Sequence, residues 1–128
     1  MIRVVAAIIE QDGRFLLTRR PSGTHLEGLW EFPGGKIDEG ETDQQALVRE
    51  LREELDVEAI VGKLEFQTTH AYPERTVSLF FYRCTLQGQP RPVLGQQIRW
   101  VTREELAALG LPPADEELVR RLIDTPPR

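Results

Sequence analysis

The opening part of the chain contains short apolar runs separated by turn signals. Residues 2–10 form a β-branched run that predicts a strand, and residues 14–20 predict a second strand after a turn at 11–13. Residues 30–32 alternate in polarity, which is typical of a short strand. Because proline and adjacent glycines interrupt regular structure, residues 33–35 are predicted to break it.

The strongest helical pattern lies over residues 42–55. Thr42 is a good N-terminal cap, and Gln45 completes a capping box three residues later. Leucines recur at positions i, i+4 and i+8 of this segment, namely Leu47, Leu51 and Leu55. This spacing predicts a helix that buries a leucine stripe in the core.

The rest of the chain predicts further strands and two shorter helices. The expected elements are a strand running to Tyr72, a hairpin turn at 72–75, a strand over 77–85, a loop over 87–96, a strand over 98–101, a helix capped by Thr102 and Glu105 that ends at Gly110, and a last helix carrying Leu118 and Leu122. Because strands and helices interleave while some neighbouring strands are linked by hairpins, we expect an α/β fold with a mixed sheet and helices on its faces. We expect a single domain over residues 1–128.

The composition is that of an ordinary globular protein with an acidic balance. The net charge of −5 argues against a nucleic-acid duplex as partner, because duplex binding needs a basic surface. It is compatible with a small phosphorylated ligand, since a divalent metal ion bridges an acidic site to a polyphosphate. The lone Cys84 excludes an internal disulfide. No segment predicts a membrane span or a signal peptide, so a cytoplasmic location is expected.

Three glutamates on the helix with the leucine stripe are the best candidates for chemistry. Glu50, Glu53 and Glu54 stand at i, i+3 and i+4, so they share one helix face. Such carboxylates repel one another, and the flanking Arg49 and Arg52 offset part of this cost. One interpretation is a solvated, salt-bridged surface. The other is a site for Mg²⁺ or Mn²⁺, because hard cations prefer carboxylate oxygens.

The segment before this helix favours the metal site. Adjacent glycines at Gly34 and Gly35 let the backbone approach a ligand closely. Over residues 35–57 the chain resembles the signature of the Nudix hydrolase family, and the matching residues are Gly35, Glu41, Arg49, Glu50, Leu51, Glu53, Glu54 and Val57. The one departure is Asp56, which stands where the family has glycine and which is able to adopt a left-handed helix end. Segments outside this box resemble the MutT-like branch of the family.

The resemblance implies a Nudix-type α/β/α sandwich, in which a metal-activated water attacks a phosphorus of a diphosphate. It places the metal at Glu50, Glu53 and Glu54 and at the backbone of Gly34 and Gly35, with one of these glutamates as the base for the water. It also implies that Arg49 orients the acidic cluster and that Glu41 supports the loop before the helix. MutT-like members often carry a further acidic ligand at the position of Leu94, so the number of metal ions and the identity of the base stay open.

Four residues are candidates for substrate binding. By the same resemblance, Arg20 and Arg75 are expected to contact the nucleotide, and a guanidinium is suited to grip phosphate through two hydrogen bonds. Phe32 lies beside the glycine pair and is expected either to line a base pocket or to pack in the core. Asp115 occupies a position that faces the nucleobase in MutT-like members, and it is also a good N-cap for the last helix.

These features predict a Mg²⁺-dependent nucleoside triphosphate pyrophosphohydrolase that takes a small nucleotide substrate. We rank 8-oxo-dGTP first, as in nucleotide-pool sanitising for DNA repair, because an ionised Asp115 accepts hydrogen bonds and suits a base edge rich in donors. The alternatives are CTP or dCTP, a nucleotide sugar or ADP-ribose, and an inactive nucleotide-binding Nudix module. The sequence disfavours the last, because all the glutamates of the box are present. The oligomeric state is left open.

Overall fold

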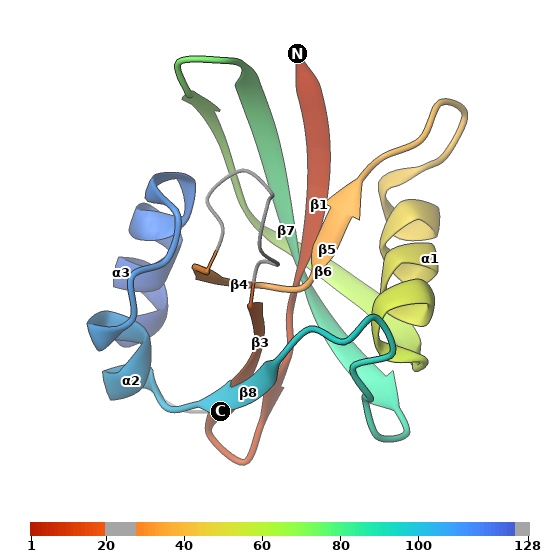
Figure 1. The fold of residues 1–128 in the computed structure, drawn as a ribbon, viewed down its shortest axis with the longest axis vertical. Coiled ribbons are helices and arrows are strands. Elements are labelled where there is room, and N and C mark those ends of the chain that lie inside the picture. The colour runs from red at the N-terminus through yellow and green to blue at the C-terminus, as the bar shows by residue number, and fades with distance from the viewer. Residues whose placement is uncertain (20–27, 125–128) are drawn as a thin grey trace.

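The computed structural model describes residues 1–19 and 28–124, which form two β-sheets with helices on either side (Figure 1). The strands are β1 (Ile2–Ile8), β2 (Glu10–Gln11), β3 (Arg14–Arg19), β4 (Trp30–Glu31), β5 (Gly34–Lys36), β6 (Glu58–Ala71), β7 (Thr76–Gln87) and β8 (Ile98–Val101). The helices are α1 (Asp43–Leu55), α2 (Arg103–Ala108), the 3-10 turn η1 (Pro113–Asp115) and α3 (Glu116–Asp124). α1 lies on one side of the sheets, and α2 and α3 lie on the other, so the predicted α/β/α architecture is confirmed.

The first sheet is mixed, as predicted, with strand order β5-β1-β7-β6. β1 runs parallel to β7, with Ile2 opposite Val77 and Ile8 opposite Arg83, whereas β5 and β6 are antiparallel to their neighbours. β6 and β7 form a hairpin at the predicted turn, where the Tyr72 N–H donates to the Arg75 carbonyl oxygen over 2.7 Å. The turn of this hairpin lies at the same end of the sheet as the start of β1 (Figure 1).

The second sheet is antiparallel and is separate from the first. Its central strand β3 pairs with β2, β4 and β8, and Phe15 stands opposite Val101 in the β3–β8 pair. The two strands of that pair lie far apart along the chain. Patterns within short windows of the sequence therefore predict the strands but not their division between two sheets.

The strand β5 corrects a prediction. Residues 33–35 predict a break in regular structure, yet Gly34–Lys36 forms a strand that pairs with β1, with Gly35 opposite Val5. A Cβ on Gly34 would lie 2.0 Å from the Val5 carbonyl oxygen, so only glycine lets the chain approach β1 this closely. Pairing with β1 thus outweighs the local tendency of the proline–glycine segment to form a loop.

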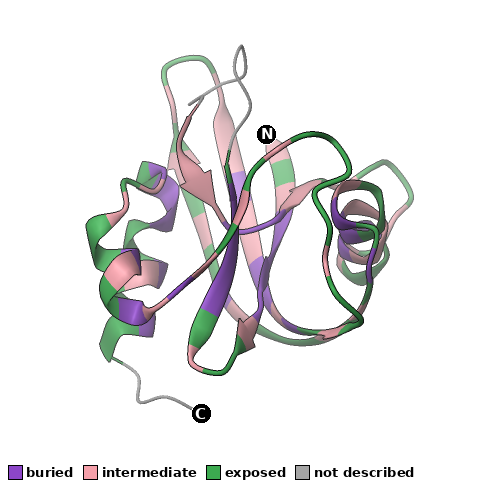
Figure 2. Cartoon of the chain, turned by 60° about the horizontal axis from the view of Figure 1, so that its bottom comes forward, coloured by how far each residue is buried: buried purple, intermediate pink, exposed green. Residues whose placement is uncertain are grey.

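The helix α1 begins at the predicted cap and buries the predicted stripe. Gln45 N donates to Thr42 Oγ1 over 3.1 Å, and Thr42 N donates to Gln45 Oε1 over 3.0 Å, which completes the capping box. The stripe of Leu47, Leu51 and Leu55 is fully buried. Buried residues gather on the inner faces of the helices and along the central strands (Figure 2).

The strand β1 is buried on both faces and separates two cores. Val5 and Ala7 pack in the core that contains the leucine stripe of α1, whereas Ala6 and Ile8 pack in the core beneath α2 and α3. A strand covered on both faces needs apolar residues at successive positions, which explains the unbroken apolar run in the sequence.

The C-terminal part of the chain follows the prediction with two differences. The capping box of Thr102 and Glu105 is present, but α2 ends at Ala108 rather than at Gly110. The turn η1 leads directly into α3, so Asp115 belongs to a 3-10 turn instead of having the extended conformation of an N-cap residue. In the described part of the chain, no helix combines the length and the apolar character that crossing a membrane would need.

Candidate active site

A pocket of about 390 Å³ opens between the two sheets, α1 and η1. It brings together most of the predicted site residues, and those in its wall are Phe32, Gly34, Gly35, Glu50, Glu54, Arg75 and Asp115. We refer to the part of the wall that contains the Glu50 and Glu54 carboxylates of α1 as the acidic end; the wall also contains Asp115 of η1 and apolar side chains. The predicted phosphate contact Arg20 lies outside the described residues.

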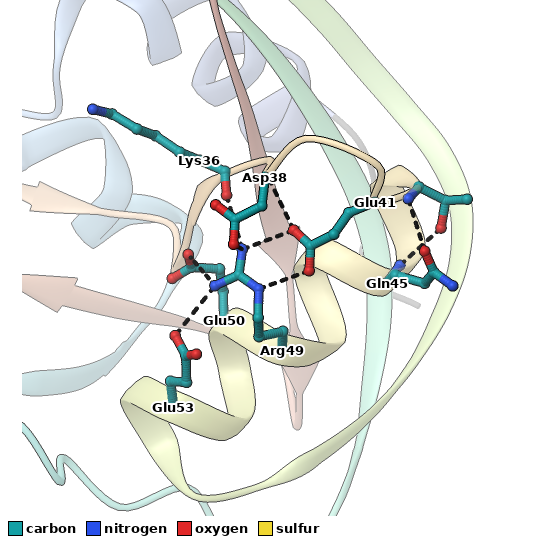
Figure 3. Close-up of polar contacts among 8 residues, drawn as sticks. Lys36, Asp38, Glu41, Gln45, Arg49, Glu50 and Glu53 are labelled. Carbon is teal, nitrogen blue, oxygen red and sulfur yellow. Dashed lines mark hydrogen bonds and ion pairs between the residues drawn. The ribbon is translucent and has the colours of Figure 1, made fainter.

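Arg49 is the centre of an ion-pair network at the acidic end (Figure 3). Its guanidinium donates to both carboxylate oxygens of Glu41, over 2.7 and 2.9 Å, and to Glu50 Oε1 over 3.0 Å. It also reaches Glu53 Oε2 at 3.2 Å and Asp38 Oδ2 at 3.4 Å. One arginine therefore holds four carboxylates that come from α1 and from the loop before it.

The network fixes the loop between β5 and α1 to the helix. Arg49 also donates to the Lys36 carbonyl oxygen over 3.1 Å, and the Asp38 N–H donates to Glu41 Oε1 over 2.9 Å. The hydrogen bond from Arg49, followed by that from the Asp38 backbone, lowers the pKa of Glu41. The Glu41 hydrogen bond is also the largest cause that raises the pKa of the Arg49 guanidinium. Both groups are therefore held in their charged forms.

Glu50 and Glu54 face the pocket under different constraints. Burial raises the pKa of Glu50, although its hydrogen bond to Arg49 opposes this effect. Burial raises the pKa of Glu54 to about 8, and the nearby charges of Glu50 and Glu31 add to the shift. Glu54 Oε2 is buried without a hydrogen-bond partner among the described residues. A buried, unsatisfied carboxylate oxygen is costly, and a divalent cation is a ligand that would satisfy it.

The second glycine of the pair makes room for this arrangement. A Cβ on Gly35 would lie 2.4 Å from Glu50 Cδ, so the Glu50 carboxylate packs directly on the backbone of β5. The Gly34 backbone also forms a hydrogen bond to Glu54, which lowers the pKa of that carboxyl group against the effect of burial. The glycine pair thus lies within reach of both pocket carboxylates, as its predicted place in the site requires.

Glu53 differs from the other two glutamates. Its side chain is 57% exposed, it pairs with Arg49, and it does not contribute to the pocket wall. Within residues 1–19 and 28–124, no three His, Cys, Asp or Glu side chains are already grouped so that they could hold a metal ion. Nη1 of Arg49 lies between two of the three carboxylates, because it donates to Glu50 over 3.0 Å and to Glu53 over 3.2 Å.

The residues near Leu94 show how the chain differs where a further acidic ligand is expected. Leu94 is 68% exposed at the pocket wall, and Gln96 lies beside it.

Asp56, which replaces the glycine of the box, has φ 49° and ψ 47°, so it adopts the predicted left-handed conformation. Its carboxylate forms an ion pair with Arg91. The departure from the family pattern is therefore accommodated locally.

The structure adds pocket residues that the sequence analysis missed. Glu31 from β4 lies in the pocket wall and is close enough to raise the pKa of Glu54. Arg19 and Lys36 also line the pocket. The position of Glu31 between two aromatic residues, two residues before Pro33 and the glycine pair, was a signal that could have drawn attention to it.

This fold and acidic pocket are those of a known class of hydrolase. A family model described as NUDIX domain matches residues 4–121, so the chain belongs to the NUDIX domain family and is a Nudix hydrolase. Members of this family generally use a divalent metal ion and act on small nucleotides.

Individual relatives lie in the MutT-like branch. The chain is 43% identical to the CTP pyrophosphohydrolase of Escherichia coli (strain K12) over 124 residues, which cover 93% of this chain and 89% of the relative. It is 40% identical to the 8-oxo-dGTP diphosphatase of Haemophilus influenzae over 126 residues, which cover 97% and 93%. The solution structure of the E. coli ORF135 protein superposes with a TM-score of 0.82 at 42% identity and covers 94% of this chain and 86% of that one.

Proposed function

We propose that this chain is a Mg²⁺-dependent enzyme that hydrolyses a nucleoside triphosphate to the monophosphate and pyrophosphate. The observation that carries this proposal is the Glu54 carboxylate, which has a buried oxygen without a partner among the described residues and lies in the same pocket as Glu50 and Asp115. A hard cation fits the acidic end, and a nucleoside fits beside Asp115 and the apolar side chains of the wall. Both groups of residues line one pocket, so an enzyme could bind the nucleoside and cleave its triphosphate in the same place.

The donor set supports a magnesium site at the acidic end. Glu50 and Glu54, together with Glu53 and the Gly34 and Gly35 backbone, would hold the ion. When bound, Mg²⁺ neutralises charge on the phosphoryl oxygens and lowers the pKa of a coordinated water. Glutamates that the ion does not fully engage are suited to accept the proton of the attacking water.

The chain's own residues prepare this end for catalysis. Arg49 donates to Glu50 over 3.0 Å and to Glu41 through two hydrogen bonds. These bonds hold the loop before α1 against the helix. We assign Arg49 the role of orienting the carboxylates and Glu41 the role of support. Arg75, together with Arg20, is proposed to bind the phosphate chain of the substrate.

Recognition of the base is assigned to Asp115 and Phe32. Both side chains are almost fully buried, at 3% exposure each, and both line the pocket. An ionised carboxylate only accepts hydrogen bonds, so Asp115 suits the N1–H and amino group of guanine or the N7–H of 8-oxoguanine. This favours 8-oxo-dGTP over CTP or dCTP. The 43% identity to a CTP pyrophosphohydrolase makes a cytidine nucleotide the second candidate.

Product analysis on a panel of nucleotides tests this proposal. With Mg²⁺ and 8-oxo-dGTP, dGTP, CTP or dCTP, chromatography should show monophosphate and pyrophosphate, and chelation of the metal should abolish the reaction. Diphosphate plus orthophosphate would contradict the proposed cleavage position. Asp115→Ala should raise KM for the preferred base and reduce the selectivity of the panel. Unchanged relative rates among the bases would remove Asp115 from base recognition.

A further inference from the structure

The loop between β7 and β8 docks on the C-terminal end of α1. The Arg91 N–H donates to the Leu55 carbonyl oxygen over 2.8 Å, and the Val93 N–H donates to the Glu54 carbonyl oxygen over 3.3 Å. The side chain of Gln96 adds a bond to the same Glu54 carbonyl oxygen over 2.9 Å. A distant segment thus satisfies carbonyl groups that a helix end leaves without partners inside the helix.

Gln96 connects two parts of this contact. While its Nε2 donates to the Glu54 carbonyl oxygen, its Oε1 accepts from the Leu94 N–H over 3.0 Å. Both polar ends of the amide are therefore used, one on the helix and one on the loop. The side chain is partly buried at the edge of the pocket, where it lines the wall together with Glu54.

The contact restrains Glu54, whose carboxylate is buried close to other negative charges. Glu54 lies in the last turn of α1, and helix ends tend to fray. Its carboxylate is buried close to the charges of Glu50 and Glu31, which disfavour its ionised form. Metal ligands must be held within about 0.5 Å of their working position, so the main chain at Glu54 needs an anchor.

We propose that Gln96 is a positioning residue that anchors the main chain of Glu54 and so sets the metal affinity of the site. This inference rests on the proposed function, in which Glu54 is a metal ligand. The loop that would supply a further acidic ligand at Leu94 acts in this chain through Gln96. The Gln96 side chain carries no charge, and it fixes Glu54, a ligand that α1 already provides.

Titration with Mn²⁺ alone, without nucleotide, tests the proposal. Free Mn²⁺ is measured by electron paramagnetic resonance for the parent protein and for Gln96→Ala. The variant should bind Mn²⁺ about 10-fold more weakly, at the lower end of the range for partners that orient metal ligands. At a metal concentration that does not saturate the site, the kcat of the variant should fall in line with its metal affinity. At saturating metal, its KM for the nucleotide should stay within about twofold of the parent value.

The matched control is Arg91→Ala in the same loop. The Arg91 side chain is 70% exposed and pairs with Asp56, so its removal loosens the same helix end without touching the bonds of Gln96. Arg91→Ala should bind Mn²⁺ like the parent protein, even if both variants melt at similarly reduced temperatures. Equal loss of Mn²⁺ affinity in both variants would overturn the proposal, because general loosening of the loop would then explain it. Parent-like binding by Gln96→Ala would overturn it as well.

Gln96→Glu separates anchoring from metal coordination. The glutamate keeps the length of the side chain, but its ionised carboxylate cannot donate to the Glu54 carbonyl oxygen. An anchoring role predicts Mn²⁺ binding weaker than in the parent protein. Binding as tight as in the parent or tighter would overturn the proposal, because loss of the hydrogen bond to the Glu54 carbonyl oxygen would then cost no metal affinity.

The parent protein and Glu54→Gln distinguish this inference from the proposed function. If the parent protein binds no Mn²⁺, or if Glu54→Gln binds it like the parent, the proposed metal site is wrong. If Glu54→Gln loses Mn²⁺ affinity while Gln96→Ala retains it, the site is right and only the anchoring role fails.

Discussion

Two ion-pair networks in this molecule differ in charge balance. In the first, Arg49 holds Asp38, Glu41, Glu50 and Glu53 beside the pocket. In the second, two arginines pair with two carboxylates away from the pocket wall: Glu10 accepts from Arg83 and Arg103 over 2.9 Å each, and Arg83 also pairs with Glu65.

The difference shows what each network is for. The second network is buried and electrically balanced, and it joins β2, β6, β7 and α2. Its charges are compensated by one another, although Nη2 of Arg103 is buried without a hydrogen-bond partner among the described residues. The first network carries an excess of negative charge, and burial together with the nearby charge of Glu50 disfavours the ionised form of the neighbouring Glu54. Folding alone does not compensate that excess, which supports the proposed cation site beside the first network.

The sharpest test of this difference is to break the balanced network. Glu10→Gln removes the charge between two arginines, of which Arg103 has a side chain only 9% exposed. Removing one partner of a buried pair typically costs about 3–5 kcal/mol, so urea unfolding should show a loss of that size. The turnover of the folded protein should stay within about twofold of the parent. A large loss of turnover with unchanged stability would show that this network also serves catalysis.

Removal of a carboxylate beside the Arg49 network should instead lower the turnover and raise the stability of the metal-free protein. Glu54→Gln keeps the shape of the side chain but removes its charge, and we expect kcat to fall by roughly 10²-fold or more. Because the folded-state pKa of Glu54 is about 8 against a usual 4.5, its ionisation lowers the stability of the metal-free protein as pH rises between these values. At pH 8 the metal-free variant should therefore melt above the parent protein, by about 5 °C.

Calorimetry in a chelating buffer at pH 5 and pH 8 provides the control for this prediction. The difference between variant and parent should be small at pH 5, where Glu54 is protonated in the folded state. Near-parent turnover by Glu54→Gln would show that the metal site lies elsewhere. A melting temperature that falls at pH 8 would show that the carboxylate is satisfied in the metal-free protein.

The smallest of the three effects is expected at Arg49. Arg49→Lys keeps the positive charge but loses the planar group that binds Glu41 through two hydrogen bonds and Glu50 through a third. We expect kcat to fall by about 10-fold, with a loss of about 1 kcal/mol in stability. Steady-state kinetics and urea unfolding measure both quantities. Full activity in Arg49→Lys would show that charge compensation, rather than orientation of the carboxylates, is what the site requires.

Features set by neighbouring residues could be predicted from the sequence. The capping box of Thr42 and Gln45, the leucine stripe and the hairpin at Tyr72–Arg75 each depend on local spacing, and each is present. The box glutamates were found for the same reason, because one helix turn sets their relation. The left-handed conformation of Asp56 also follows from local backbone preference.

Features set by distant pairing could not be predicted. The strand β5 exists because Gly34 and Gly35 pair with β1, and the second sheet exists because β3 pairs with β8. Glu31 enters the acidic end of the pocket through the β3–β4 pairing, and Gln96 reaches Glu54 from a loop 42 residues away. In each case the contact depends on the completed fold, which no short window of the sequence contains.

The parallel pairing of β1 with β7 has a consequence for how the chain folds. On this side, Ile2 to Ile8 find their partners only at Val77 to Arg83, so β1 is paired there only after most of the intervening chain has been made. Closing a loop of this length costs entropy before any contact repays it, which slows folding relative to a helical protein of equal size. Until β7 leaves the ribosome, the apolar N-terminal segment has no partner strand on that side. The nascent chain therefore passes through a period in which its most hydrophobic stretch is open to chaperones and to other chains.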